Sequence, residues 1–185
     1  MIENIRQDIK AHLKPSRYKH TLGVCKLAVS LAKWYGIDVY DAEIAALLHD
    51  YAKYESDESI LAVYRETDEP VDAVIKNHPN LGHGYVSAVL ARKKYDINDG
   101  VFNAIKNHTF GNTGMTLLEK IIYLADALEE GRDYEGIEGV RSFLYKDLNT
   151  ALLMACENTL LFEIKRGNMV HMKTVLMRNE LLEEK

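Results

Sequence analysis

Apolar side chains recur at helical spacing along almost the whole chain, and this pattern constrains the fold more than any other feature. Only three prolines interrupt it, at Pro15, Pro70 and Pro79. Apolar residues that return every three or four positions are typical of amphipathic helices, and the alternation typical of half-buried strands is scarce here. The sequence therefore predicts an all-α fold, a bundle of helices.

Capping residues indicate where several of these helices begin and end. Ser16 is expected to cap the helix that follows Pro15, and Gly36 to end it. Thr116 stands three residues before a glutamate, which is the spacing of a capping box. Further helices are expected to start at Asp41 and at Asp147. The apolar faces predicted for three helices are Ile2, Ile5, Ile9 and Leu13; Val24, Leu27, Leu31 and Trp34; and Leu148, Ala151, Leu152, Ala155, Thr159 and Phe162.

Length and composition exclude several classes of protein. The 185 residues suit one domain, and an apolar fraction of 47% is enough for a sizeable core. The net charge of -5 and the lack of a lysine- or arginine-rich run argue against nucleic acid and against an acidic membrane surface as partners. A small anionic substrate stays possible, because a metal ion can act inside a negatively charged protein.

The sequence also favours a cytoplasmic protein. The N-terminal segment MIENIRQDIK carries charges where a signal peptide needs apolar residues. No uninterrupted apolar run approaches the roughly 20 residues that span a bilayer. The two cysteines, Cys25 and Cys156, lack a CxxC partner and are interpreted as reduced core thiols.

Two polar positions stand where the helical pattern demands burial. The pair His49–Asp50 closes the hydrophobic segment EIAALLHD, and Asp126 lies inside IIYLADAL. A buried carboxylate without a partner costs several kcal/mol, so Asp126 needs a cation beside it. That cation is either a metal ion or a basic side chain such as Arg132.

Three further histidines occupy positions from which they can reach a shared site. His20 lies within a predicted helix, His83 begins the segment HGYVSAVLA, and His108 ends FNAIKNH. Imidazole and carboxylate groups suit iron, manganese, zinc or similar ions, and no thiolate is needed. The candidate ligands follow one another as H…HD…H…H…D at His20, His49, Asp50, His83, His108 and Asp126.

This order resembles that of the HD-domain metallophosphohydrolases. The segments RYKHTLGV, LLHDYAKY, HGYVSAVLA and IKNHTFGNTGMTLLEKIIYLADALEEGRDYEGIEGVR are together similar to the YqeK family. Bacterial members of that family are symmetrical diadenosine tetraphosphate hydrolases. The resemblance covers about residues 17–179 and implies an HD-domain helical bundle. It also implies that a metal-activated hydroxide cleaves diadenosine tetraphosphate into two ADP.

The resemblance implies a site with one or two metal ions. One ion is expected at His20, His49, Asp50 and Asp126, and a second at His83 and His108 with Asp50 bridging. Iron is the family expectation, as a divalent or trivalent ion, and manganese, cobalt or zinc are compatible alternatives. The family often has a proline soon after its third histidine, which makes His78, followed by Pro79, a rival of His83.

Residues near these ligands are candidates for contacts with the substrate. Lys53 resembles the lysine of the family's HDxxK motif, and Arg132 can grip a phosphate with two hydrogen bonds. Each also has an ordinary alternative, an exposed lysine in one case and an ion pair with Asp126 or Glu129 in the other. Further candidates for substrate binding are His83, Thr109, Tyr134, His171 and Thr174.

Three readings of function follow, of which hydrolysis of diadenosine tetraphosphate is favoured. A second is another HD-type nucleotide phosphohydrolase or phosphodiesterase that acts on a dNTP or an alarmone. A third is a regulator that binds metal or nucleotide without catalysis. Residues 1–185 are expected to form a single HD domain, with a metal-binding core at about 16–130 and C-terminal helices at about 137–183 completing the bundle. A homodimer is compatible with the apolar N-terminal stripe, which could instead pack on the chain's own core.

Overall fold

The computed structural model describes residues 1–184, and within them the chain forms only helices, turns and loops. The predicted all-α fold class is therefore confirmed. The N-terminal half contains α1 (Ile2–His12), α2 (Pro15–Tyr35), α3 (Val39–Leu48), α4 (Asp57–Glu66), α5 (Ala73–Asn77), the 3-10 turn η1 (Pro79–Gly82) and α6 (His83–Tyr95). The C-terminal half contains α7 (Asp99–Asn107), α8 (Leu117–Leu128), α9 (Ile137–Arg141), α10 (Leu148–Lys165) and α11 (Met172–Glu183).

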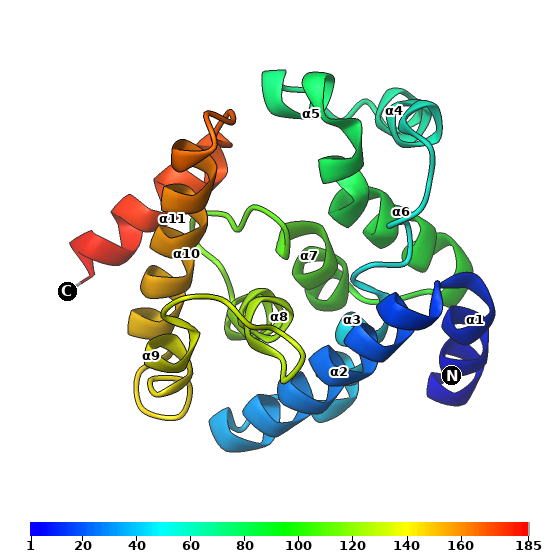
Figure 1. The fold of residues 1–185 in the computed structure, drawn as a ribbon. Helices are drawn as coiled ribbons and strands as arrows, with labels where there is room; N and C mark the ends of the chain where they lie inside the picture. Colours follow the sequence, from blue (N-terminus) through cyan, green and yellow to red (C-terminus); the bar gives the residue numbers. More distant parts are fainter. Residues whose placement is uncertain (185) are drawn as a thin grey trace.

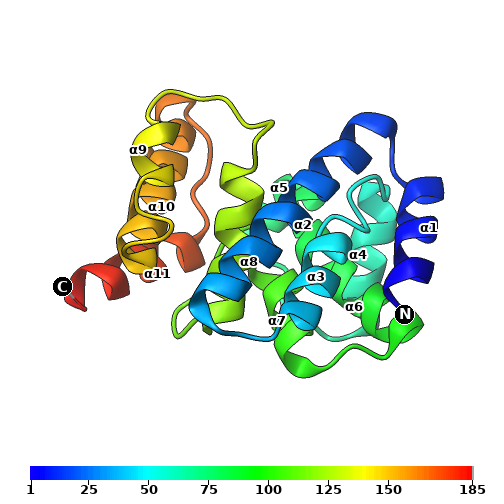
Figure 2. The same ribbon diagram turned by 90° about the horizontal axis from the view of Figure 1, so that it is seen from below.

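The layout places α2, α3, α7 and α8 in the middle of the molecule. Helix α2 packs on α3 and α8, and α7 packs on α3, α6 and α8. Figure 2 shows α1 at one end of this group, while α9, α10 and α11 lie together at the other end. Helices α4, α5 and α6 lie to one side of α7 (Figure 1). None of the helices in residues 1–184 has the length and apolar composition that crossing a bilayer requires.

The helix ends agree with the sequence at some positions and differ at others. Thr116 and Glu119 form the predicted capping box, and the Asp147 side chain accepts a hydrogen bond from the Thr150 backbone N–H. Gly36 ends α2 with a left-handed φ of 69°, a conformation that glycine adopts without steric cost. These three predictions are confirmed.

Two predicted N-caps are wrong. Ser16 lies inside α2, because Pro15 is already the first residue of that helix and Lys14 precedes it. Proline suits this position because the first backbone N–H of a helix has no partner within the helix. In α3 the cap is Asp38, whose carboxylate accepts hydrogen bonds from the backbone N–H groups of Tyr40 and Asp41.

A main core joins the two ends of the chain, and a second, smaller buried cluster that includes Ile60 and Tyr85 lies at α4, α5 and α6. The main core includes Ile5 and Ile9 of α1, both fully buried, and reaches Leu181 of α11. The apolar N-terminal stripe thus packs on the chain's own core. Three residues of the predicted apolar faces are instead exposed: Trp34 by 63%, Phe162 by 56%, and Thr159. Trp34 lies in the last turn of α2 and contacts only the edge of Tyr145 among aromatic rings, and Phe162 lines a cavity.

Candidate metal centre

The structure brings together all six side chains that the sequence predicts as metal ligands. Four of them are almost completely buried, with exposed fractions of 0% for His49, 2% for Asp50, 2% for His83 and 3% for His108. His20 lies on α2, and His49 and Asp50 directly follow α3. His83 begins α6, His108 directly follows α7, and Asp126 lies on α8.

Asp50 lies between two pairs of imidazoles. Its Oδ2 is 3.2 Å from His49 Nε2 and 3.9 Å from His20 Nε2. Its Oδ1 is 3.0 Å from His83 Nε2 and 3.9 Å from His108 Nε2. The two oxygens of one carboxylate therefore face two different halves of the cluster, which is the arrangement that a bridging ligand needs.

Asp126 completes the half of the cluster that contains His20. Its Oδ1 is 2.9 Å from His20 Nε2 and 3.9 Å from His49 Nε2. The same oxygen is 2.6 Å from Arg132 Nη2, so the basic partner considered from the sequence is present beside the candidate metal ligands. Asp126 is largely but not completely buried, as its side chain is 22% exposed and lines a cavity.

All four imidazoles hold their Nδ1 atoms in hydrogen bonds with protein oxygens. His49 Nδ1 is 2.7 Å from the Ala46 carbonyl oxygen, His83 Nδ1 is 2.7 Å from that of Asn80, and His108 Nδ1 is 2.8 Å from that of Ile105. A carbonyl oxygen only accepts, so the proton of each neutral ring lies on Nδ1. The lone pair of Nε2 then faces the cluster, which is the tautomer that binds a metal through Nε2.

His20 is oriented differently, by a side chain. Its Nδ1 is 3.0 Å from Glu129 Oε1, and Glu129 also accepts a hydrogen bond from the Gly131 backbone N–H at 2.6 Å. Glu129 is only 5% exposed. A glycine at position 23 makes room for it, because a Cβ on Gly23 would collide with the Glu129 carboxylate.

The buried Nε2 and carboxylate atoms fit a metal site. His20 Nε2, His49 Nε2 and Asp50 Oδ1 are buried and make no hydrogen bond of acceptable geometry, although other polar atoms lie close. Buried polar atoms without partners are rare in folded proteins. The six residues form three overlapping groups of three, and within each group the ligand atoms lie within 4.8 Å of one another. The groups are His20–His49–Asp50, His49–His108–Asp126 and Asp50–His83–His108.

Burial and neighbouring charges shift the pKa values of the cluster. Burial would lower the pKa of His49, but Asp50 beside it outweighs burial and raises it, so a bound ion would replace the proton on this ring. Burial alone would raise the pKa of Asp50, but His49 and His83 hold it well below its usual value, so the group is a carboxylate. Burial also opposes the charge of Asp126, yet the contacts with His20 and His49 lower its pKa. Burial, together with His49 and His83, lowers the pKa of His108 to about 3, which leaves a neutral imidazole. Anionic oxygen and neutral nitrogen are the forms that bind metals.

Two cations lie at the edge of the cluster beside Asp50. Lys53 Nζ is 3.1 Å from His83 Nε2 and 3.7 Å from Asp50 Oδ1, and burial lowers the pKa of its ammonium group. Arg17 Nη1 donates to Asp50 Oδ2 at 2.8 Å. Arg17 was not a candidate from the sequence, although its spacing of three residues from His20 places both side chains on one face of α2.

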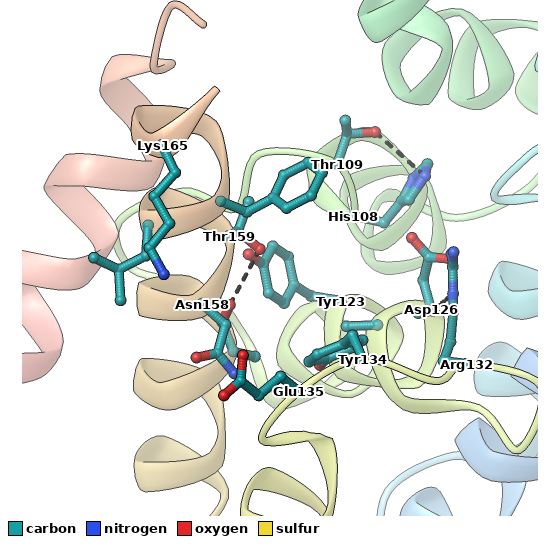
Figure 3. A pocket seen from close by; sticks show the side chains of 14 residues that line it. His108, Thr109, Tyr123, Asp126, Arg132, Tyr134, Glu135, Asn158, Thr159 and Lys165 are labelled. Atoms are coloured by element: carbon teal, nitrogen blue, oxygen red, sulfur yellow. Dashed lines mark hydrogen bonds and ion pairs between the residues drawn. The ribbon is translucent and has the colours of Figure 1, made fainter. Parts of the chain in front are cut away.

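A cavity of about 680 Å³ opens on the cluster, and we call it the first cavity. His108, Asp126 and Arg132 line its inner wall, as Figure 3 shows, and Lys165 lies across from them. Besides its contact with the Asp126 carboxylate, Arg132 donates from Nε to the Asp126 carbonyl oxygen at 2.9 Å. Tyr134, half-buried, also lines this cavity, which is of a size that takes small organic ligands.

The remaining candidates for substrate binding lie beside His108. Thr109 Oγ1 is 3.3 Å from His108 Nε2. His171 stacks on Phe110 with ring centroids 3.9 Å apart and is paired with Asp72 through Nε2 at 2.6 Å. The Thr174 hydroxyl donates to the Phe110 carbonyl oxygen at 2.8 Å, so in this structure it fastens α11 to the loop after His108.

Of the two rivals for the third histidine, only His83 lies in the cluster. His78 is exposed and caps the C-terminal end of α5. Gly84, next to His83, permits a close approach of α6 to the end of α7, because a Cβ there would lie 2.9 Å from Thr109 Oγ1. The role of each residue as a ligand stays a prediction.

Comparison with known proteins first identifies the class of protein to which the chain belongs. The HD domain family matches residues 17–131, a range that contains all six residues of the cluster. The sequence is 38% identical over 175 residues to "Bis(5'-nucleosyl)-tetraphosphatase, symmetrical" of Bacillus subtilis, with 94% of each chain covered. A protein of the same name from Halalkalibacterium halodurans is 39% identical over 179 residues, covering 96% of this chain and 95% of its own length.

A solved structure agrees with this assignment. The crystal structure of a predicted HD superfamily hydrolase involved in NAD metabolism from Clostridium acetobutylicum superposes with a TM-score of 0.96 at 39% identity. It covers 100% of this chain, and the alignment spans 98% of that chain. The chain belongs to the HD domain class and, within it, to the YqeK family, as the sequence motifs predicted.

Proposed function

We propose that the protein is a metal-dependent hydrolase that cleaves diadenosine tetraphosphate symmetrically into two ADP. The observation that carries the proposal is the cluster of four imidazoles and two carboxylates at the wall of the first cavity. Relatives support the proposal as well, because two symmetrical bis(5'-nucleosyl)-tetraphosphatases are 38% and 39% identical to the chain over nearly its full length.

We assign the metal ligands by their positions around Asp50. His20, His49, Asp50 and Asp126 would hold one ion, while His83 and His108 would hold a second that shares Asp50. When bound, such ions supply Lewis acidity, which activates water and offsets the charge of phosphate oxygens. Iron is the proposed metal, with manganese, cobalt or zinc as alternatives that the same nitrogen and oxygen donors accept.

Lys53 and Arg132 are the proposed cations for the phosphate chain. Both have a partner at the cluster in this structure: Lys53 lies beside His83, and Arg132 beside Asp126. A bound ion would take over the neutralisation of Asp126, and Arg132 would then be free to bind a phosphate oxygen. Arginine binds phosphate with two parallel hydrogen bonds, whereas lysine acts as a point charge.

Other groups around the cavity would bind the rest of the nucleotide. Tyr134 offers an aromatic face in the first cavity, and Thr109 offers a hydroxyl beside His108. His171 and Thr174 would act by holding Phe110 in place, as their contacts with it suggest. The two buried free cysteines suit the proposed cytoplasmic location. A homodimer stays a prediction, but the N-terminal stripe no longer supports it, because that stripe packs on the chain's own core.

The variant Asp50→Ala tests the site. It removes the carboxylate that contacts both halves of the cluster, so we expect loss of bound metal and a fall in kcat on the order of 10³ or more. Metal content would be measured by elemental analysis of protein purified without added metal, and helical content by circular dichroism. The control is Asp99→Ala, which removes an aspartate whose side chain is 90% exposed. Full activity of Asp50→Ala would refute the assignment.

Product analysis separates this function from the alternatives. Diadenosine tetraphosphate, dNTPs and alarmones would be incubated with the metal-loaded protein, and nucleotide products resolved by chromatography. ADP as sole product from the tetraphosphate is the expected result. Release of AMP or orthophosphate would favour another HD-type phosphohydrolase or phosphodiesterase, and binding without turnover would favour a regulator.

A further inference from the structure

A second cavity adjoins the first beside Thr109, the residue that follows His108. Its volume is about 340 Å³, and it lies between α5 and η1 on one side and the end of α10 with the following segment on the other. It shares Thr109 and Thr159 with the first cavity, so the two adjoin. Its walls include Asn80, Thr109, Glu163, Asn168, Met169 and His171.

Each cavity is lined by residues that belong to the cluster, adjoin one of its members in the chain or accept a hydrogen bond from one. The first cavity touches His108 and Asp126 directly. The second is lined by Asn80, whose carbonyl oxygen accepts from His83 Nδ1 at 2.7 Å, and by Thr109, next to His108. The two cavities meet at Thr109, so their junction lies next to His108 of the cluster.

The second cavity has the chemistry of a nucleoside site and not of a phosphate site. Its lining residues, all within the described part of the chain, include no lysine or arginine, and His171 is already paired with Asp72. A carboxylate, Glu163, is present and accepts from Asn168 Nδ2 at 2.7 Å, which leaves its second oxygen available. A carboxylate repels phosphate, but it accepts hydrogen bonds from hydroxyl and amino groups. Met169, 47% exposed, offers a sulfur atom that packs well against aromatic rings.

From this placement we infer that the second cavity binds the second nucleoside of a two-ended dinucleoside polyphosphate. The inference rests on the proposed function and deepens it. With one nucleoside in each cavity, the middle of the phosphate chain lies at the cluster. A symmetrical cut requires the central P–O–P bond at that place. Glu163 would accept hydrogen bonds from the ribose or the amino group of the base, and Met169 would pack on the base.

The test compares a two-ended with a one-ended substrate. The metal-loaded double variant Glu163→Ala/Met169→Ala would be assayed with diadenosine tetraphosphate and with adenosine 5'-tetraphosphate, which has a single nucleoside. We expect KM for the two-ended substrate to rise about tenfold, which corresponds to the loss of one set of apolar pocket contacts. The kinetic constants for the one-ended substrate should stay within about twofold of the wild type, since its nucleoside can use the first cavity.

The matched control is Glu130→Ala/Met172→Ala. It removes a glutamate that is 79% exposed and a methionine that is 62% exposed, neither of which lines either cavity. A wild-type enzyme that cleaves only the two-ended substrate would equally support a second nucleoside site. Unchanged KM for both substrates, or an equal rise for both, in the test variant would overturn the inference. If the wild type cleaved neither substrate, the proposed function itself would fall and the inference with it.

Discussion

The imidazole of His20 is the one ring of the cluster whose orientation depends on another side chain. Glu129 holds its Nδ1, while backbone carbonyls hold Nδ1 of the other three rings. Groups that orient metal-binding histidines typically change metal affinity about 10–100-fold when they are removed. For Glu129→Ala we therefore expect metal affinity to fall within that range, measured by competition with a chelator.

The pair of variants Glu129→Gln and Glu130→Ala gives this prediction its controls. Glutamine keeps one oxygen that can accept from His20 Nδ1, but its amide nitrogen cannot accept from the Gly131 N–H as Glu129 Oε2 does, so it should restore the affinity in part. Glu130 is the neighbouring residue but is exposed and paired with Lys26, so its removal should leave affinity unchanged. If Glu129→Ala bound metal as tightly as the wild type, the orienting role would be wrong.

The sequence could identify ligands more readily than the groups that support them. The six cluster residues stand out because imidazoles and carboxylates interrupt apolar segments or end helices. Arg17 and Glu129 do not, since each is one of many charged residues at a surface-like position and acquires its partner only through packing. Glu129 lies 109 residues from His20 in the chain. The exposure of Asp126 was likewise not predictable, because it depends on where the first cavity opens.

At the scale of elements, Asp8 connects α1 to the rest of the bundle. Its Oδ2 accepts hydrogen bonds from Tyr51 Oη at 2.8 Å, from Lys94 Nζ at 2.7 Å and from the Tyr95 hydroxyl. Burial would raise the pKa of Asp8, but the contacts with Lys94 and the tyrosines outweigh it and lower the pKa. Hydrogen bonds to a charged group contribute about 1.5–3 kcal/mol each, and partial exposure reduces this.

We expect Asp8→Asn to lower the free energy of unfolding by about 1–2 kcal/mol near neutral pH. Because the folded pKa is below the unfolded value of 3.8, the contribution is fully present above that value and is lost as the pH falls through the folded pKa. Urea unfolding from pH 7 downwards would measure it. The difference from the wild type should stay constant in the neutral range and shrink at acid pH; Asp99→Asn, at an exposed aspartate, should show little difference. A difference independent of pH would contradict the electrostatic origin.

Helix boundaries show where local sequence is sufficient to predict a capping residue or a buried face, and where it is not. Thr116 has no competing cap nearby, and its glutamate three residues on strengthens the signal. Asp38 and Asp41 compete within one turn, and only the backbone path decides between them. Trp34 fits the apolar stripe of α2 but lies beyond the packed part of that helix, so periodicity alone could not show its exposure.

For the whole molecule, the main core predicts a single cooperative unfolding transition. Apolar residues from Ile5 to Leu181 belong to one cluster. Arg141 adds hydrogen bonds from α9 to the carbonyl oxygens of Leu128 and Glu129, at 3.0 Å and 2.8 Å. We therefore propose that residues 1–185 fold as one domain, in which the C-terminal helices stabilise the part that carries the cluster. Small single domains usually unfold in an all-or-none manner, and we expect the shared main core to extend this behaviour to the chain of 185 residues.

The single tryptophan provides a local probe for this prediction. Trp34 reports on α2, whereas circular dichroism at 222 nm reports on all helices. In metal-free protein the two unfolding curves in urea should coincide, since metal binding complicates two-state analysis. Curves that do not coincide would show that part of the chain unfolds separately. Because Trp34 contacts Tyr145, between α9 and α10, its fluorescence also senses loss of the C-terminal helices.

The backbone hydrogen bonds of His49, His83 and His108 have a consequence for how the protein can vary. A carbonyl group is present whatever side chain stands at positions 46, 80 and 105, so no substitution there deletes the group that sets the ring's tautomer. Only the contact with Glu129 is open to replacement by mutation. Of the four contacts that orient the rings through Nδ1, a single one can therefore be changed by substitution without replacing a ligand, both in an engineered variant and during sequence divergence.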